Sequence, residues 1–321
     1  MNSQVEDLIA RITQAYVARS GPTPLEYSSS LSSLLGCEVH LKCEHLQPTG
    51  SFKIRGASNK IRILSPEQRR HGVTTASTGN HGKAVAYAAR AAGVSATVYV
   101  AADAAPAKLE GIRALGAELV IIDGLSLDAE LKAREAAATQ GKTYISPYND
   151  LDVVAGQGTL GVELLQQLPD MDAVFVSVGG GGLIGGTGTA LKAARTNIDM
   201  VGVWPQNSVC MLRALEAGAI VPVEEQPTLS DGTAGAIEPG SVSFPICQHV
   251  VDHRITVSET EIASAMRRLA QSDHWMVEGS AGVALAGLVQ HASAWRGKKV
   301  VVVVCGRNIS LESFLSAVSP A

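Results

Sequence analysis

The sequence has few of the features that mark nucleic-acid-binding or secreted proteins. Its 26 basic residues are outnumbered by 30 acidic ones, and no long run of Lys and Arg occurs, which argues against nucleic acid and anionic membranes as partners. The five cysteines are odd in number and form no C-x-x-C pair, so a reduced, cytoplasmic chain is expected. The N-terminus carries acids where a signal peptide requires a basic flank and an apolar run, so we predict no targeting segment.

The sequence also has no continuous apolar segment suited to a membrane. Between Asp172 and Lys192 lie 19 uncharged residues, but seven of them are glycine and four of these are consecutive. Glycine at that density disfavours a continuous helix. We therefore interpret the stretch as a strand, a glycine loop and the start of a helix.

What the chain does have is a large apolar content in short, regular segments. It is 321 residues long and 46% hydrophobic, enough for a large core, and the length suggests two globular units. Expected strands begin at residues 38, 73, 96, 118, 142, 173, 200 and 300. Expected helices cover 6–18, 80–93, 106–117, 159–168 and 259–271. Strands that are apolar throughout and separated by helices indicate parallel sheets covered on both faces, so the predicted fold class is α/β.

The order of these elements predicts one domain inserted in another. Residues 74–146 hold strands and helices enough for a small sheet, and residues 1–73 and 147–321 would form a larger domain around it. The small domain would carry a substrate loop, and the large one a cofactor. An arrangement of this kind leaves a cleft, where ligands usually bind.

A glycine loop is the first candidate site. "SVGGGGLIGG" follows the strand at 173 and opens a helix. Glycines let backbone N–H groups close around an anion, and the helix dipole favours negative charge there. The loop lacks the Lys-Ser/Thr ending of a Walker loop. A phosphate site is the favoured interpretation, and a tight strand-to-helix turn is the alternative.

A second loop, "TASTGNHGKA" at residues 75–84, lies between a strand and a helix N-terminus. It offers hydroxyls, an amide and backbone N–H groups to a carboxylate. An ordinary helix cap rich in Ser and Thr is the alternative.

Lys53, in "PTGSFKIRGA", supplies an amine that needs a partner to be chemically useful. An unperturbed lysine, with a pKa of about 10.4, is a poor nucleophile near neutrality. Pyridoxal phosphate would supply an aldehyde for the lysine and a phosphate for the glycine loop. Cys305 ends the strand that begins at 300, and it is either a core cysteine or a group presented to a ligand at the strand's carboxyl end.

The ordered set of motifs resembles the fold-type II pyridoxal-phosphate enzymes, specifically the serine/threonine dehydratase and serine racemase group. The resemblance covers nearly the whole chain through "GPTPLEYS", "LKCEHLQPTGSFKIRGA", "TASTGNHGKA", "VAGQGTLGVE", "SVGGGGLIGG", "EGSAGVALAG" and "CGRN". The stretch "GVWPQNSVCMLRALEAG", with "GAIEPGSVSF" after it, is similar to the hydroxyectoine-utilisation dehydratase branch of that group. The resemblance implies a homodimer or homotetramer that acts on a small amino acid.

The resemblance also implies the site residues. Lys53 would bond to pyridoxal phosphate and remove the Cα proton, and Thr78 would lie closest to the reacting carbon. The other cofactor contacts would be Phe52, Asn80, Cys305 and the phosphate-binding Gly179, Gly180, Gly181 and Gly182. The substrate carboxylate would bind Ser77, Thr78, Asn80 and His81. A thiol at the pyridine nitrogen cannot keep that nitrogen protonated as an aspartate would, which suits β-elimination more than transamination.

The implied reaction is α,β-elimination from a 3-hydroxy amino acid of the L-threonine or L-serine type, which gives a 2-oxo acid and ammonia. Alternatives are a dehydratase for 3-hydroxyaspartate, 3-phenylserine or a hydroxyectoine-derived compound, a β-replacement enzyme of the cysteine synthase type, and a ligand-sensing protein that uses only the glycine loop.

Three positions depart from the family pattern. Thr78 replaces a serine of the racemase branch, and Tyr148 replaces Asn or Phe near the ring. Trp204 and Cys210 take the places of two carboxylate ligands for a divalent cation. An indole N–H has no lone pair to donate and a thiol is too soft for Mg²⁺ or Ca²⁺, so we expect no metal. The alternative is that Glu216, Glu224 or Glu225 supplies a carboxylate ligand instead.

Overall fold

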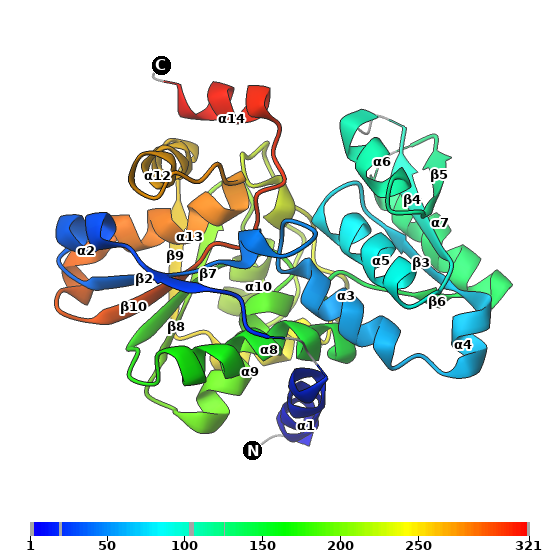
Figure 1. Cartoon of the computed structure of the whole chain (residues 1–321), viewed down its shortest axis with the longest axis horizontal. Helices are drawn as coiled ribbons and strands as arrows, with labels where there is room; N and C mark the ends of the chain where they lie inside the picture. The colour runs from blue at the N-terminus through cyan, green and yellow to red at the C-terminus, as the bar shows by residue number, and fades with distance from the viewer. Residues whose placement is uncertain (1–2, 19–20, 103–105, 125, 320–321) are drawn as a thin grey trace.

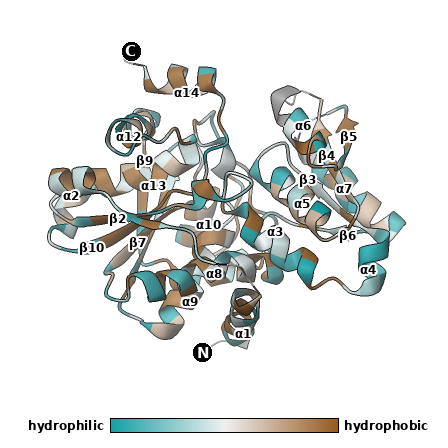
Figure 2. Ribbon diagram, viewed as in Figure 1, coloured by the Kyte–Doolittle hydropathy of each residue, from teal (hydrophilic) through white to brown (hydrophobic). Residues whose placement is uncertain are grey.

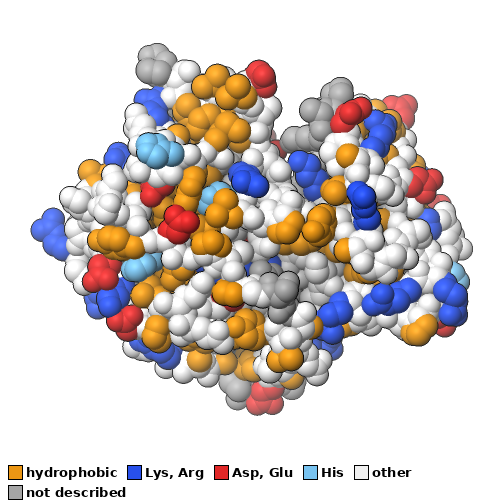
Figure 3. Space-filling model, viewed as in Figure 1, with side chains coloured by type: hydrophobic (Ala, Val, Ile, Leu, Met, Phe, Trp, Pro, Cys, Tyr) orange, Lys and Arg blue, Asp and Glu red, His pale blue; other side chains and the backbone are white. Residues whose placement is uncertain are grey.

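Two lobes, each built around one β-sheet, make up the molecule (Figure 1). The structure is a computed structural model that describes residues 3–18, 21–102, 106–124 and 126–319. The space-filling view shows a notch between the lobes at the top of the molecule (Figure 3). The predicted α/β class, with two largely parallel sheets flanked by helices, is confirmed.

Within the described residues the first sheet has six strands in the order β1-β2-β10-β7-β8-β9, and only β1 runs antiparallel to its neighbour. Their bounds are Leu25–Tyr27 (β1), Glu38–Lys42 (β2), Lys299–Val303 (β10), Ala173–Ser177 (β7), Asp199–Pro205 (β8) and His253–Val257 (β9). The second sheet has, among the described residues, four parallel strands in the order β5-β4-β3-β6. These are Glu118–Ile122 (β5), Ala96–Ala101 (β4), Val73–Ala76 (β3) and Thr143–Tyr144 (β6).

The helices connect the strands and cover both sheets. The α-helices are Ser3–Val17 (α1), Ser29–Leu35 (α2), Lys53–Arg62 (α3), Pro66–His71 (α4), Asn80–Ala91 (α5), Pro106–Arg113 (α6), Ser126–Gln140 (α7), Leu151–Gln167 (α8), Gly182–Ala194 (α9), Cys210–Ala217 (α10), Ser243–Val250 (α11), Glu259–Ser272 (α12), Gly279–Gln290 (α13) and Leu311–Val318 (α14). Single 3₁₀ turns cover Glu44–Leu46 (η1), Asp231–Thr233 (η2) and Ala292–Trp295 (η3). No described helix is long and apolar enough to cross a membrane.

The first sheet is buried on both faces, which explains its continuous apolar strands. Helices α2 and α13 lie on one face and α8 and α9 on the other (Figure 1). Every residue of β7 is buried, and hydrophobic residues follow the central strands in the hydropathy view (Figure 2). Because β7 and β10 are parallel neighbours, their carboxyl ends lie at the same edge. The segments that follow them, the glycine loop and Cys305, are therefore brought together there.

The second sheet is covered on its two faces by different helices. On β4, Val98 and Val100 pack with residues of α5, whereas Tyr99 packs with alanines of α7, as the alternation of side chains along a strand requires. Ile54 and Ile61 of α3 join the first of these clusters. Helix α3 therefore contacts the second sheet's core, although the strands of that sheet run only from Val73 to Tyr144. The expected domain boundaries stay a prediction.

Two strands and one helix start were not predicted correctly. Strand β1 has three residues with partly exposed side chains, and β9 has an exposed start, so neither shows the apolar run on which the prediction depended. Helix α8 begins at Leu151, before the expected position 159, because Asp150 caps it by accepting hydrogen bonds from Asp152 N and Val153 N.

A group of buried ionic side chains joins α3 to the first sheet. The Arg55 guanidinium of α3 bonds both carboxylate oxygens of Glu44 at 2.6 Å and those of Glu163 at 2.6 and 2.8 Å. Lys42 of β2 bonds Glu163 at 2.6 Å, and all four side chains are fully buried. Although burial alone would raise it, the Arg55 charge brings the pKa of Glu44 down to about 2. Two positive charges therefore contact two negative ones directly.

Replacing Arg55 by Lys should lower the free energy of unfolding by about 3 kcal/mol, because one ammonium cannot satisfy four carboxylate oxygens and leaves buried acceptors unpaired. Denaturant unfolding measures the loss. Lys132→Gln, which removes an exposed pair with Glu135, is the control and should leave the midpoint unchanged. An Arg55→Lys protein as stable as the parent would show that the group does not hold α3.

Candidate active site

Lys53 lies at the carboxyl edge of the first sheet because backbone contacts fix the turn before it. Ser51 forms an antiparallel bridge with Gly306, and Phe52 N donates to Cys305 O at 3.0 Å. Both partners directly follow β10, and Lys53 is the first residue of α3. The lysine and Cys305, far apart in sequence, are thereby held in register.

The surroundings of the Lys53 amine make it less basic than a lysine in water. Its Nζ donates to Pro147 O at 3.1 Å and lies 5.1 Å from the centroid of the Phe52 ring. Burial lowers the pKa of Lys53 to about 8, against the opposing influence of Cys305 and Glu278. About a tenth of the amine is therefore neutral at pH 7, far more than for an ordinary lysine, and the neutral form is the one that a nucleophile or a general base requires.

The glycine loop adopts a conformation that side chains would prevent. A Cβ at Gly180 would lie 2.3 Å from the Tyr148 ring, and one at Gly179 would lie 2.8 Å from Thr233 O. Gly181, with φ of 82°, precedes α9, and no side chain of the described residues caps that helix. The first N–H groups of α9 therefore have no side-chain partner among the described residues, which suits an anion, and the phosphate site stays a prediction.

The second predicted loop reaches across the notch to the first lobe. Asn80, the first residue of α5, donates through Nδ2 to Glu278 Oε1 at 2.7 Å and accepts through Oδ1 from Asn308 Nδ2 at 2.5 Å. The neighbouring Ser77 hydroxyl accepts a hydrogen bond from Gly79 N at 3.2 Å, and Thr78 is half-buried. The loop is therefore tied to the lobe that carries Lys53.

Glu278 was not assigned by the sequence analysis, although its charge acts directly on Lys53. Its side chain is 4% exposed and also accepts from Asn308 N at 2.9 Å. A Cβ at Gly306 would lie 2.3 Å from its Oε1, so glycine is needed there for the carboxylate to fit. An acid just before the Gly-Ser that opens a helix in "EGSAG" was the available signal.

His81 has only its backbone N–H to offer a substrate. The ring is 3% exposed, and burial together with the Lys53 charge lowers the pKa of His81 to about 3, so the imidazole is neutral. Its Nε2 lies 2.9 Å from Ile145 O, which requires the proton on Nε2. Nδ1 is then an acceptor, without a partner among the described residues, and cannot donate to a carboxylate.

Cys305 is a neutral thiol at the same edge of the sheet. Burial raises the pKa of Cys305 well above its usual range, and the Ser177 hydroxyl lies 3.6 Å from its sulfur. The structure thus gathers Lys53, Phe52 and Cys305 beside the glycine loop, with the 77–81 loop facing them. The roles given to these residues stay predictions.

The positions named for a lost metal site lie together, apart from Lys53. Trp204 is 1% exposed. Glu225 accepts a hydrogen bond from the Ser208 hydroxyl and contacts Cys210. Burial, and then the Glu225 charge, raise the pKa of the Cys210 thiol to about 12. Glu225 is the one carboxylate in these contacts. No group of three His, Cys, Asp or Glu suited to a metal ion occurs within the described residues. The expectation that the protein needs no metal stays a prediction.

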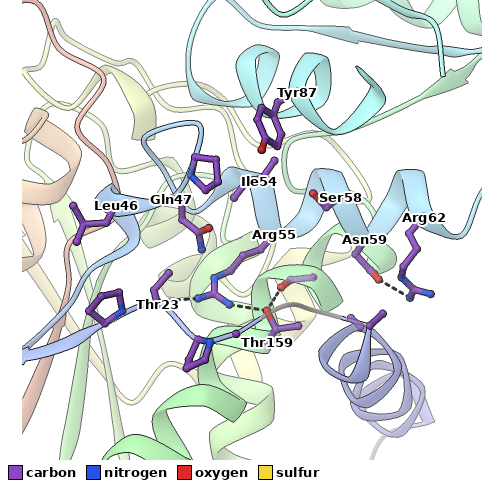
Figure 4. Close-up of a pocket in the computed structure, with 17 residues that line it drawn as sticks. Thr23, Leu46, Gln47, Ile54, Arg55, Ser58, Asn59, Arg62, Tyr87 and Thr159 are labelled. Carbon is purple, nitrogen blue, oxygen red and sulfur yellow. Dashed lines mark hydrogen bonds between the residues drawn. The ribbon is translucent and has the colours of Figure 1, made fainter. Parts of the chain in front are cut away.

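A cavity of about 440 Å³ lies behind α3 (Figure 4). Arg55, Ser58, Asn59 and Arg62 of that helix line it, together with Tyr87 of α5. Arg55 is about 200° around the helix from Lys53, so the cavity is on the far side of α3, and none of the predicted site residues lines it.

Comparisons with known proteins identify relatives of this chain. Residues 18–306 match a family described as "Pyridoxal-phosphate dependent enzyme". An L-threonine ammonia-lyase of Thermotoga maritima is 40% identical over 90% of this chain and 72% of its own length. An L-threo-3-hydroxyaspartate ammonia-lyase of Pseudomonas sp is 37% identical over 92% of each chain.

Solved structures show the same fold. The processed form of threonine deaminase isoform 2 from Solanum lycopersicum superimposes with a TM-score of 0.94 at 31% identity, over 99% of this chain and 93% of its own. Maize serine racemase does so with a TM-score of 0.90 at 31% identity, over 97% and 95%.

The lowered pKa of Lys53 predicts how its reactivity depends on pH. With a pKa of about 8, the neutral fraction of the amine rises about tenfold from pH 7 to pH 9 and then levels off. Capture of pyridoxal phosphate by the cofactor-free protein, followed by absorbance, should show that plateau. A rate that climbs steadily past pH 9, as for a lysine with an ordinary pKa, would contradict the effect of burial. Lys53→Ala should capture none.

Proposed function

Because the chain belongs to the pyridoxal-phosphate-dependent enzyme family and is a lyase of hydroxy amino acids, we propose that Lys53 is its catalytic lysine and that L-threonine and L-serine are its substrates. The observation that carries this proposal is the half-buried Lys53 amine, with its lowered pKa, at the start of α3. The amine lies between an uncapped glycine loop and a loop of hydroxyl and amide groups. A lysine of lowered pKa beside a candidate anion site is typical of a functional site.

The described residues fit the cofactor. When bound, pyridoxal phosphate supplies an aldehyde for the lysine, a phosphate, and a ring that accepts the electron pair left at Cα. Gly179, Gly180, Gly181 and Gly182 would hold the phosphate through the open end of α9, and Phe52, Asn80 and Cys305 would contact the ring. The fully buried Ser51 hydroxyl, next to Phe52, has no partner among the described residues, and is a further polar group open to a ligand.

The 77–81 loop would bind the substrate carboxylate. Ser77, Thr78 and Asn80 offer side-chain donors, and the first N–H groups of α5 add the favourable end of the helix dipole. His81 would contribute through its backbone N–H, because its ring proton is used by Ile145 O. Glu278 and Asn308 hold the Asn80 amide from the other lobe, so carboxylate binding would also bring the two lobes together.

Lys53 would take the Cα proton once its amine is released. Burial raises the neutral fraction of the amine, and Pro147 O, at 3.1 Å, holds one N–H and so orients the lone pair. Cys305, which stays a thiol, would offer the cofactor ring no strong acid, and this would favour loss of the β-hydroxyl over transamination. The Thr78 hydroxyl would lie nearest to the reacting carbon.

The names of the relatives do not identify the side chain of this protein's substrate. One similar protein is an L-threonine ammonia-lyase and another an L-threo-3-hydroxyaspartate ammonia-lyase. Comparing kcat/KM for L-threonine, L-serine, 3-hydroxyaspartate and 3-phenylserine decides among them. A clear preference for 3-hydroxyaspartate or 3-phenylserine would replace our assignment.

Purified protein should release ammonia and a 2-oxo acid from L-threonine or L-serine, and Lys53→Ala should lower kcat by about 10³-fold or more, since one amine serves as cofactor link and base. An ammonia assay and the visible absorption band measure the two roles. Lys132→Ala, an exposed lysine on α7, is the control and should retain both. Turnover at the normal rate in Lys53→Ala would refute the assignment.

Thr78 variants test the carboxylate loop. Thr78→Ala should lower kcat/KM by about tenfold to a hundredfold, the usual loss for one hydrogen bond to a charged group, whereas Thr78→Ser keeps the hydroxyl and should stay within about threefold. If Thr78→Ala has the same kcat/KM as the parent, the loop is an ordinary helix cap.

A further inference from the structure

Arg134, on α7 in the second lobe, has partners from both lobes. Its guanidinium bonds Glu130 of the same helix at 2.9 Å and Glu238 at 2.7 Å, and it lies over the Tyr144 ring with Cζ 4.3 Å from the centroid. Glu238 belongs to the segment between η2 and α11, far from α7 in the sequence. The Arg134–Glu238 ion pair is therefore a contact between the second sheet's helix and a loop of the first lobe.

Glu238 in turn holds the segment that follows β6. Its Oε2 accepts from Asn149 Nδ2 at 2.7 Å, and its backbone N–H donates to the Tyr148 hydroxyl at 3.0 Å. The same hydroxyl donates to Ala236 O at 3.4 Å. Ala236 and Glu238 thus hold the side chains of Tyr148 and Asn149 in position.

From Tyr148 two routes lead to the glycine loop. The first is direct, because the Tyr148 ring fills the space beside Gly180 where a Cβ would otherwise lie. The second starts at the neighbouring Asn149, whose Oδ1 accepts from Val242 N at 2.9 Å. The next residue, Ser243, donates through Oγ to Gly180 O at 2.5 Å. The position of Glu238 therefore decides where the ring and the loop lie.

The ion pair contributes little stability of its own. The Arg134 and Glu238 side chains are 39% and 21% exposed, and pairs of that exposure are worth little. In addition, Glu238 Oε1 and the Tyr144 hydroxyl are buried without partners among the described residues, and each such group is a cost. The weak attraction of the ion pair is offset by these two unpaired polar atoms. The contact is therefore better explained by the positions that it gives to its neighbours than by a gain in folding free energy.

We propose that the Arg134–Glu238 ion pair is a positioning contact of the active site. It couples the lobe that carries the 77–81 loop to Tyr148 and the glycine loop, and so sets how well the two binding loops fit one substrate. The inference rests on the proposed function, since it concerns the approach of the substrate loop to the cofactor loop. Tyr148 and Asn149 are the side chains through which the ion pair acts.

Three single variants of the holoenzyme test this. Glu238→Gln keeps the size of the side chain and an oxygen for Asn149 but loses the charge, and Arg134→Gln loses it from the other side. Each should raise KM about fivefold, the effect of losing one partly exposed pair, with kcat within about twofold. Glu130→Gln is the matched control, because it removes the other acidic partner of the same arginine and leaves Glu238 in place, and should leave KM unchanged.

The double variant Arg134→Gln/Glu238→Gln should raise KM no further than the larger single effect, because both changes break one contact. If Glu238→Gln and Arg134→Gln leave KM within twofold of the parent, or if Glu130→Gln raises KM as much as they do, the proposal is overturned. Where Arg134→Gln does not fold, Glu238→Gln decides by itself.

A readout without turnover separates this inference from the proposed function. In the protein without cofactor, amide hydrogen exchange across 236–243 and at Tyr148 should be faster in Glu238→Gln than in the parent and unchanged in Glu130→Gln. Equal exchange in Glu238→Gln and the parent would overturn the positioning role. A parent protein that releases no ammonia from any 3-hydroxy amino acid would refute the function and leave this comparison valid.

Discussion

The arrangement of the site depends on how one arginine is neutralised in the interior. Arg55 is fully buried two residues after Lys53, and its charge is balanced only because Glu44, from η1, and Glu163, from α8, converge on it. Breaking one partner of a buried ionic group leaves an uncompensated charge at a cost of several kcal/mol. The start of α3 therefore has one permitted position against the first sheet. Lys53, on the opposite side of that helix, takes its place at the sheet edge as a consequence.

The second constraint is that the reactive groups come from both lobes. Asn80 stands at the start of α5 in the second lobe, while Glu278 and Asn308, its partners, belong to the first. Arg134 and Glu238 repeat the pattern at another place on the boundary. Because each lobe folds around its own sheet, contacts of this kind fix the position of one lobe against the other. The lowered pKa of Lys53 arises from burial.

Local patterns in the sequence predicted most of the fold's strands and the segments of the candidate site. Apolar runs predicted eight of the strands, and the lysine motif and the two loops named the segments that the structure assembles around Lys53. Strands β1 and β9 were not predicted, because short, partly exposed strands show no apolar run. Glu278 and the buried ionic group around Arg55 were not predicted for another reason. Their partners are distant in sequence, and only the fold shows that these charges are buried together. The neutral state of the His81 ring likewise follows from burial and from the Lys53 charge, neither of which a motif reveals.

The central claim is that the amine at the start of α3 carries the cofactor. Reducing the purified holoenzyme with borohydride fixes pyridoxal phosphate to the amine that holds it, and peptide mass spectrometry then identifies the residue. We expect one labelled peptide, modified at Lys53 and not at the nearby Lys60 or Lys83. Label on another lysine, or a protein that retains no label after reduction, would show that Lys53 does not hold the cofactor.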